Sequence, residues 1–371
     1  MSTESSLSIG LMSGTSLDGV DGVLLDCPTT GETPRVVAHA ARPFPAELRA
    51  EFLALNAAGL DELHRSAIAA LQLTDLYAEV VTDLLRSAHQ TASAIRAIGA
   101  HGQTVRHRPD LGYTLQLNAP ATLAERSGIP VVADFRSRDV AAGGQGAPLV
   151  PAFHRAVFAV PGADIAVLNL GGFANLSLLF ADGRTLGFDT GPGNVLLDHW
   201  AHCHTGRAFD ERGAWAAGGL VQAGLLRAFL RDAFFARPAP KSTGRDDFHP
   251  RWLDQHLAEH ARTPEPRDVQ ATLAALTVQS VADALLRAMP RVSQLVVCGG
   301  GARNDDLLRR LQAALPDVAC GLSDVRGIPA EQVEAAAFAW LAQQALRGVP
   351  GNLPAVTGAA GPRVLGAIYP G

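Results

Sequence analysis

One pattern constrains the fold of this chain more than any other: a strand, a glycine-bearing turn and a second strand occur twice, far apart. Apolar runs at 7–12 and 19–26 flank a polar turn. Runs at 164–170 and 174–180 flank a second turn, and Asp182-Gly183 then leads into a third run at 186–189. Such alternation predicts β-hairpins. Because mixed helical and strand patterns follow both hairpins, we expect two α/β domains of related plan.

The remaining periodicity divides the chain near residue 150. We expect one domain over 1–150 and a second over 151–371, with the last helix able to pack back on the first domain. A cleft between two such domains is the usual place for a small-molecule site. Further strands are expected at 97–100, 131–135 and 295–298, and helices at 60–87, 122–127, 148–158, 195–201, 220–235, 269–289, 304–314 and 330–347.

Composition excludes several classes of function. A net charge of −5 leaves no broad basic surface for nucleic acid. No uninterrupted apolar run reaches 18 residues and the first eight residues have no apolar core, which argues against a membrane partner and against secretion. The four cysteines are far apart and form no CxxC pair, as is typical of a cytoplasmic protein without disulfides.

Two glycine-bearing turns are candidate phosphate sites, because clustered N–H groups and hydroxyls form concavities that bind anions. Asp18 and Asp21 in the first turn could orient a hydrated Mg²⁺. An ordinary hairpin tip remains the alternative. Two turns at corresponding places in two domains could hold one polyphosphate from both sides. The first turn contributes Gly14, Thr15, Ser16, Leu17, Asp18, Gly19, Val20 and Asp21, and the second contributes Gly171, Gly172 and Asn175.

A third glycine turn, Gly299-Gly300-Gly301, lies between a predicted strand and a predicted helix. Its backbone could approach a flat ring or a phosphate closely. The turn does not fit GxGxxG, and GxxxxGK[ST] is absent from the chain, so the Rossmann and P-loop interpretations lose support.

Asp189 is the candidate for acid–base chemistry. It is expected to end a strand at a tight turn before a helix, where a carboxylate can act as a base or a metal partner. The alternative is a helix-capping role for Asp189 or Asn194.

Eight ordered motifs together resemble the anhydro-N-acetylmuramic acid kinase family from Ile9 to the C-terminus. That family belongs to the superfamily of acetate and sugar kinases, heat-shock chaperone ATPases and actin. The resemblance implies an α/β fold of two actin-like (ribonuclease H-like) domains with an interdomain ATP cleft. The motifs are MSGTSLDGVD, HGQTVRHRP, DFRSRDVAAGGQGAPLVP, NLGGFANLS, FDTGPGN, KSTGRDDF, CGGGARN and EAAAFAWLA.

The resemblance implies that ATP and water open the 1,6-anhydro ring of anhydro-N-acetylmuramic acid and leave N-acetylmuramic acid 6-phosphate, in bacterial cell-wall recycling. It implies that Gly14–Asp21 is the phosphate loop and that Asp189 is the base. It also implies a homodimer, and from the chemistry of the first turn we expect Mg²⁺ to be held through water by Asp18. By superfamily analogy, the second turn binds phosphate, and the nucleoside is bordered by Gly299, Gly300, Arg303 and Asn304.

The sugar carries a lactyl carboxylate, which the planar fork of arginine matches. Arg136 and Arg138 are the candidates, and ion pairs with Asp134 or Asp139 are the alternative.

Two further polar residues are candidates for the sugar. Gln103 follows a strand that ends at His101, and we expect His101 to be structural. Glu334 opens an apolar helical run, where it either caps the helix or faces the sugar.

Lys241 is the single lysine among 31 basic residues. A compact ammonium suits a phosphate or a fixed carboxylate, although the lysine could also be there by chance. The cluster of His199, His202, Cys203 and His204 fits no standard zinc spacing, and we do not assign it a metal.

Two other functions remain open. One is a related carbohydrate kinase that acts on another anhydrosugar or on a free 6-hydroxyl. The other is a nucleotide-switched binding protein.

Overall fold

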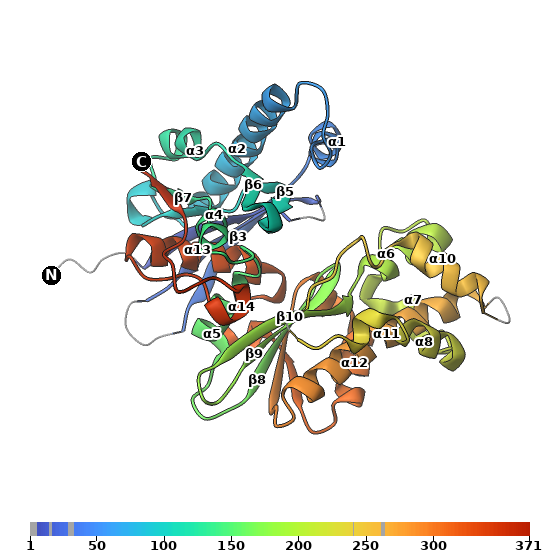
Figure 1. The fold of residues 1–371 in the computed structure, drawn as a ribbon. Coiled ribbons are helices and arrows are strands. Elements are labelled where there is room, and N and C mark those ends of the chain that lie inside the picture. The colour runs from blue at the N-terminus through green and yellow to red at the C-terminus, as the bar shows by residue number, and fades with distance from the viewer. Residues whose placement is uncertain (1–5, 15–16, 29–32, 240, 261–263) are drawn as a thin grey trace. The chain divides into compact units, whose positions relative to one another are not determined.

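The structure is a computed structural model that describes residues 6–14, 17–28, 33–239, 241–260 and 264–371. The chain divides into two compact units (Figure 1). The first comprises residues up to Val157 together with Arg326–Gly371, and the second comprises Phe158–Val325. Each unit is described by itself.

The first unit is built on a mixed sheet with the strand order β13-β7-β4-β1-β2-β3. The strands β1, β2 and β3 form an antiparallel meander, whereas β4 and β7 run parallel to β1. The short C-terminal strand β13 pairs antiparallel with β7. The strands span Leu7–Met12 (β1), Gly19–Asp26 (β2), Arg35–Pro43 (β3), Ile98–Ala100 (β4), Val131–Ala133 (β7) and Ala367–Tyr369 (β13), and a separate ladder pairs β5 (Gln103–Arg108) with β6 (Tyr113–Leu117).

The helix α13 covers one face of this sheet. Its run of small residues lets it approach closely: a Cβ at Gly99 of β4 would lie 2.0 Å from the carbonyl oxygen of Phe338. The long helix α2 packs on β2 and β3, where Gly22 faces Val80. The helices of the first unit are α1 (Ala46–Leu55), α2 (Glu62–Ser87), α3 (Pro120–Ser127), α4 (Ser137–Ala141), α5 (Val150–Phe158), α13 (Val333–Leu346) and α14 (Pro354–Thr357).

The second unit repeats the plan, with the strand order β10-β9-β8-β11-β12. Here β8, β9 and β10 form the antiparallel meander, and β11 and β12 run parallel to β8. The elements are β8 (Ile165–Leu170), β9 (Phe173–Leu179), β10 (Thr185–Pro192), β11 (Gln294–Cys298), β12 (Ala319–Leu322), α6 (Val195–Thr205), α7 (Ala214–Ala217), α8 (Ala223–Leu230), α9 (Ala233–Ala236), α10 (Pro250–Ala258), α11 (Pro266–Ala288) and α12 (Asp305–Ala314).

Helix α11 is the core helix of the second unit. It packs against β9, β10, α6, α7, α8 and α12. Among the described residues it is the helix whose length and composition could also suit a membrane span, but 72% of its most apolar window is buried inside the protein. Burial against a sheet and neighbouring helices accounts for its apolar character.

Both sheets therefore share one order if their strands are numbered within each unit: 3-2-1-4-5, with β13 added at the edge of the first. This is the ribonuclease H-like plan, and it confirms the expected α/β fold of two related domains. The second unit ends at Val325 and not at 371, because residues 326–371 belong to the first unit, as the expectation for the last helix allows. The reason is that α13 packs on β1, β2 and β4 (Figure 1, red among blue).

Most expected strands and helices are present within a few residues, but two expectations are wrong. Residues 220–235 are not one helix. The chain leaves α8 after Leu230, and the Asp232 carboxylate accepts a hydrogen bond from the Phe234 amide to begin α9. Asp189 does not end its strand, since β10 continues through a bulge to Pro192.

Candidate active site

The parallel strands of the first unit end at one edge of the sheet. There, β1, β4 and β7 are followed by Ser13, His101 and Asp134 respectively. Ligands in α/β folds bind outside the carboxyl ends of such strands. The hairpin tip, the HGQ motif and the DFR motif of the sequence analysis therefore gather at the edge that is expected to carry a site.

The first hairpin tip is tied to the rest of this edge. The Ser13 hydroxyl donates a hydrogen bond to the Gln103 side-chain oxygen, and both residues are buried. Leu17 is buried with a φ of 59°, and its amide bonds the Gly14 carbonyl oxygen, which closes the turn.

Three other members of the expected phosphate loop differ in exposure. Asp18 is exposed, Val20 is buried in the core, and Asp21 pairs with His39 at 3.3 Å. The side chain of Val20 therefore packs in the core, as does that of Leu17. Thr15 and Ser16 lie outside the described residues.

Arg136 is bound to His101. Its Nε and Nη2 atoms lie 3.0 and 2.9 Å from His101 Nε2, and its Nη1 donates to the Gly146 carbonyl oxygen at 2.8 Å. Burial, and then the Arg136 charge, lower the pKa of His101 to about 3. Desolvation lowers the pKa of Arg136 to about 10, so the guanidinium remains charged at neutral pH. The pair places a fixed positive charge at the carboxyl edge.

Glu334 lies in the first turn of α13, near that charge. Its side chain reaches solvent and makes no capping hydrogen bond. The capping alternative is therefore wrong. Desolvation and the Asp21 carboxylate raise the pKa of Glu334, while the Arg136 guanidinium opposes them. A carboxylate and a guanidinium thus stand together on the first unit.

Arg138 lies elsewhere. It is exposed and lines an open hollow of about 550 Å³ with Asp134, Ser137 and the backbone near Gly366. The ion pairs considered for Arg136 and Arg138 do not form within the described part of the chain. The Asp139 carboxylate instead accepts hydrogen bonds from the Gly146 amide and from the side chains of Asn352 and Thr357.

The second unit gathers its glycine turns at the same kind of edge. The parallel strands β8 and β11 end beside each other and lead into Gly171 and Gly299. The Gly171 and Gly172 carbonyl groups accept hydrogen bonds from the amides of Asn194 and Gly193 at 2.9 Å. The segment after β10 is thereby held against the second turn.

One row of side chains crosses the sheet of this unit. Cys298, Asn169, Asn175 and Asp189 are register partners on the neighbouring strands β11, β8, β9 and β10. Cross-strand partners share a face of the sheet. Asp189 is therefore beside the Asn175 of the expected phosphate turn.

Asp189 is held by a segment more than 50 residues further along the chain. Its amide donates to the Lys241 carbonyl oxygen at 2.9 Å, and its Oδ2 accepts a hydrogen bond from the Thr243 amide at 3.0 Å. Burial raises the pKa of Asp189 above its ordinary value, and the Thr243 amide opposes the rise. Asp189 is not a helix cap. Asn194 stands at the start of α6, but its side chain bonds the Leu170 carbonyl oxygen instead of capping the helix.

The Lys241 ammonium is already engaged by protein. It lies 3.0 Å from the Phe234 carbonyl oxygen, 3.5 Å from that of Phe235, and 4.3 Å from the centre of the Phe234 ring. These contacts explain a lysine at this position without any phosphate.

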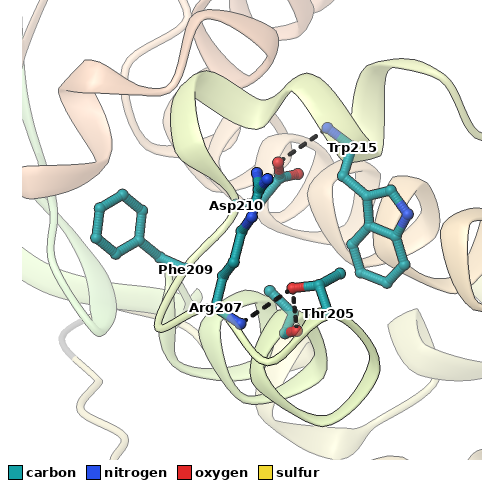
Figure 2. Close-up of a pocket in the computed structure, with 6 residues that line it drawn as sticks. Thr205, Arg207, Phe209, Asp210 and Trp215 are labelled. Atoms are coloured by element: carbon teal, nitrogen blue, oxygen red, sulfur yellow. Dashed lines mark hydrogen bonds between the residues drawn. The ribbon is translucent and has the colours of Figure 1, made fainter.

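The third glycine turn leads into α12, which Asn304 caps by accepting a hydrogen bond from the Leu307 amide. Gly213 approaches this turn so closely that a Cβ on it would lie 2.1 Å from Asn304 Oδ1. Residues 205–215, the stretch of chain that contains Gly213, also line a cavity of about 280 Å³. Figure 2 shows Phe209 and Trp215 on opposite sides of this cavity, with Arg207 and Asp210 between them.

The histidine cluster of α6 does not converge on one point. His204 packs between Trp200 and Trp215, and the Cys203 sulfur lies 3.7 Å from a His199 ring nitrogen. Across the described residues, no three His, Cys, Asp or Glu side chains come together as a metal site.

Two residues of the site were missed by the sequence reasoning. Asn169 belongs to the NLGGFAN motif, and its place one strand from Asn175 could have been inferred from the hairpin register. Thr243 acts through its backbone amide, for which residue type gives no signal.

Comparison with known proteins identifies the family. The model of the family described as anhydro-N-acetylmuramic acid kinase matches residues 6–371. The chain belongs to this family. It is accordingly a phosphotransferase, and the resemblance seen in the motifs is confirmed.

Curated relatives match this kinase along their whole length. The anhydro-N-acetylmuramic acid kinase of Bordetella petrii is 59% identical over 100% of the chain and 98% of its own length. That of Ralstonia nicotianae is 56% identical over 98% of the chain and 97% of its length.

Solved structures are more distant. An activator of 2-hydroxyisocaproyl-CoA dehydratase from Clostridium difficile with bound ADPNP has a TM-score of 0.48 at 14% identity and covers 92% of this kinase and 98% of that chain. A ROK family glucokinase from Streptomyces griseus with glucose and AMPPNP has a TM-score of 0.42 at 16% identity, with coverage of 91% and 99%. These scores are too low to support a conclusion about the site.

Proposed function

We propose that this kinase uses ATP and water to open the 1,6-anhydro ring of 1,6-anhydro-N-acetylmuramic acid. The products are N-acetylmuramic acid 6-phosphate and ADP, and the reaction is a step in the recycling of peptidoglycan. The observation that carries the proposal is the half-buried Asp189 carboxylate, with its raised pKa and its fixed orientation, in a member of this family.

The substrate has no free 6-hydroxyl, so a base must act on water. Asp189 accepts a proton from a water molecule whose oxygen attacks the anomeric carbon. The C1–O6 bond breaks and its electron pair goes to O6. O6 then bonds to the γ-phosphorus while the bond to the bridging oxygen of ADP breaks, and Asp189 releases its proton to solvent. Such phosphoryl transfer depends on positioning and charge neutralisation.

The first unit supplies groups suited to the sugar. Arg136 offers a charge for the lactyl carboxylate, and Glu334 offers an acceptor for hydroxyl or amide hydrogens. Gln103 shares its side-chain oxygen with Ser13, and its amide nitrogen lies 3.4 Å from the Thr104 carbonyl oxygen, which leaves one amide hydrogen for the sugar. Arg138 and Arg136 have different neighbours. Arg138 would therefore contact only the longer substituents of the sugar.

Each unit has one glycine turn that suits the phosphates of ATP. The tip from Gly14 to Asp21, and the turn of Gly171, Gly172 and Asn175, offer backbone amides to the phosphates. Next to the Gly299–Asn304 turn, the cavity walled by Phe209 and Trp215 suits a flat base.

Mg²⁺ fits the donors of the first tip. Mg²⁺ keeps several waters and takes few carboxylates, and Asp18 is exposed whereas Asp21 is paired with His39. Asp18 would therefore hold a hydrated ion, and the ion would neutralise charge on the phosphates.

The test is ADP release with Mg-ATP and each of three sugars: 1,6-anhydro-N-acetylmuramic acid, N-acetylmuramic acid and N-acetylglucosamine. We expect release with the anhydrosugar alone. In H₂¹⁸O the 6-phosphate product should carry one ¹⁸O at the anomeric carbon, measured before mutarotation exchanges it. ADP release with a free sugar would indicate a kinase that acts on a 6-hydroxyl. No ADP release with any of the three sugars would favour a nucleotide-switched binding protein.

Asp189→Asn tests the base, and Asp182→Asn in the same hairpin is the matched control. A general base contributes about 10²–10⁴-fold to a rate, so Asp189→Asn should lose at least that factor while it still binds ATP. A variant that keeps a tenth of the wild-type rate would exclude Asp189 as the base. The family resemblance also implies a homodimer in the cytoplasm, which light scattering of the purified protein and cell fractionation would test.

A further inference from the structure

The single lysine of the chain anchors a segment instead of facing open solvent. Its half-buried ammonium lies at the C-terminal end of α9, 3.0 Å from the Phe234 carbonyl oxygen and above the Phe234 ring. The Phe234 carbonyl oxygen also accepts the Arg237 amide at 3.2 Å, and its second lone pair is the acceptor for the ammonium. Lys241 therefore fixes its own stretch of backbone to α9.

The same stretch of backbone holds the Asp189 carboxylate. The Lys241 carbonyl oxygen receives the Asp189 amide, and two residues later the Thr243 amide donates to Asp189 Oδ2. The Thr243 hydroxyl in turn donates to Asp247 at 2.7 Å. The segment 241–243 is thus fixed at one end by the ammonium and at the other by Asp247.

We propose that Lys241 is a positioning residue for catalysis: by locking the segment 241–243 onto α9, it aims the Thr243 amide at the Asp189 carboxylate. This inference rests on the proposed function, in which Asp189 is the base. It replaces the expectation that Lys241 contacts phosphate, because the ammonium is already surrounded by carbonyl oxygens and an aromatic ring.

The chemistry of the pocket explains why a lysine serves here. The Phe234 carbonyl oxygen, the Phe235 carbonyl oxygen and the Phe234 ring all contact the one Nζ atom. Such an arrangement suits the compact ammonium of lysine better than the planar guanidinium of arginine. The titratable neighbours are Arg237 and Arg287, whose charges, after desolvation, lower the pKa of Lys241. A third guanidinium at this position would add its bulk to an already cationic helix end.

Lys241→Met is the test, because methionine keeps most of the apolar stem but loses the ammonium. We expect kcat to fall by about 10- to 100-fold, as misplacement of a catalytic group does, and KM for ATP to stay within twofold. Without the Thr243 hydrogen bond the carboxylate is harder to ionise, so the acidic limb of the kcat profile should move to higher pH. The 241–248 peptide should also exchange amide hydrogen faster.

Arg287→Met is the matched control, since Arg287 also contacts the Phe235 carbonyl oxygen, at 3.5 Å, but lies outside the segment 241–243. It should leave the acidic limb where it is. Should Lys241→Met not fold, Lys241→Gln, whose amide can donate one hydrogen bond to Phe234, takes its place.

Two results would overturn the inference. A large rise in KM for ATP with the acidic limb unmoved would show that Lys241 contacts phosphate. A purely structural role would lower the melting temperature but leave three quantities unchanged: kcat, the acidic limb of its pH profile, and the amide hydrogen exchange of the 241–248 peptide. Asp189→Asn separates these from failure of the proposed function: if that variant stays active, the base assignment itself is wrong.

Discussion

Arg136 and His101 are joined by two hydrogen bonds to a single atom: Arg136 Nε and Nη2 both donate to His101 Nε2, at 3.0 and 2.9 Å. A ring nitrogen can accept only when it carries no proton, so the His101 proton is on Nδ1. One edge of the Arg136 fork is therefore used to fix the side chain, and its charge is oriented by a neutral partner that packs on the Phe338 ring.

His101→Leu should weaken sugar binding, because it removes the acceptor that orients Arg136. We expect KM for the anhydrosugar to rise by about tenfold, the cost of roughly one hydrogen bond to a charged group, with KM for ATP unchanged. Steady-state kinetics in both substrates measure this. His64→Leu on the exposed face of α2 is the control. An unchanged sugar KM would mean that Arg136 keeps its place without His101.

Glu334→Gln should stabilise the protein at neutral pH while it lowers activity. The folded-state pKa of Glu334 is raised above its ordinary value, so ionising the carboxyl costs the folded state more than the unfolded state above the ordinary pKa. That cost disappears as the pH falls below the ordinary pKa. The gain in melting temperature should therefore be present at pH 7 and absent near pH 3.5.

Differential scanning calorimetry at the two pH values measures the Glu334 effect, with Glu125→Gln on the exposed surface of α3 as the control. A gain of equal size at both pH values would contradict the assigned cause.

Local patterns predicted the hairpins well and the long-range contacts poorly. The period-two alternation around the first two turns is a property of neighbouring residues, and both hairpins are found where the alternation predicts them. By contrast, the membership of α13 in the first unit depends on contacts between Gly10 and Ala335, more than 300 residues apart. We expect from the sequence that the last helix is able to pack on the first domain, but no local pattern gives the contacts by which it does so.

The site shows the same division. The glycine turns and Asp189 could be found from motifs, but Thr243 could not, because it acts through a backbone amide 54 residues away. The alternative of an ion pair between Arg136 and Asp139 does not form, for a tertiary reason. The Asp139 carboxylate already accepts hydrogen bonds from the side chains of Asn352 and Thr357, which lie in the C-terminal segment that packs against α4.

Gly99→Ala should destabilise the first unit. The added Cβ would lie 2.0 Å from the Phe338 carbonyl oxygen, so β4 and α13 must move apart. Overpacking of this kind costs about 1–3 kcal/mol. Chemical denaturation, followed by circular dichroism, measures the change. Gly321→Ala, where nothing lies within 4 Å of the added atom, is the control and should be nearly neutral. Equal effects of the two substitutions would contradict the close packing of α13.

Phe209→Ala should weaken ATP binding if the cavity beside the Asn304 turn holds the adenine ring of ATP. Phe209 is 57% exposed, so its removal costs the fold little, yet it forms one wall of the cavity with Trp215 opposite (Figure 2). Loss of stacking on an aromatic ring is worth about 0.5–1.5 kcal/mol, which corresponds to a rise of roughly 2- to 12-fold in the Kd for ATP. Isothermal titration calorimetry measures it.

Leu220→Ala is the control for Phe209, because Leu220 is equally apolar and even more exposed on the same unit. Quenching of tryptophan fluorescence by ATP gives a second readout. It should be present in the wild type and strongly reduced in Trp215→Phe, since Trp215 walls the cavity. If Phe209→Ala binds ATP with wild-type affinity and ATP quenches the fluorescence of Trp215→Phe as it does that of the wild type, the adenine ring lies elsewhere. The Gly299–Asn304 turn would then have to bind the nucleoside without this cavity.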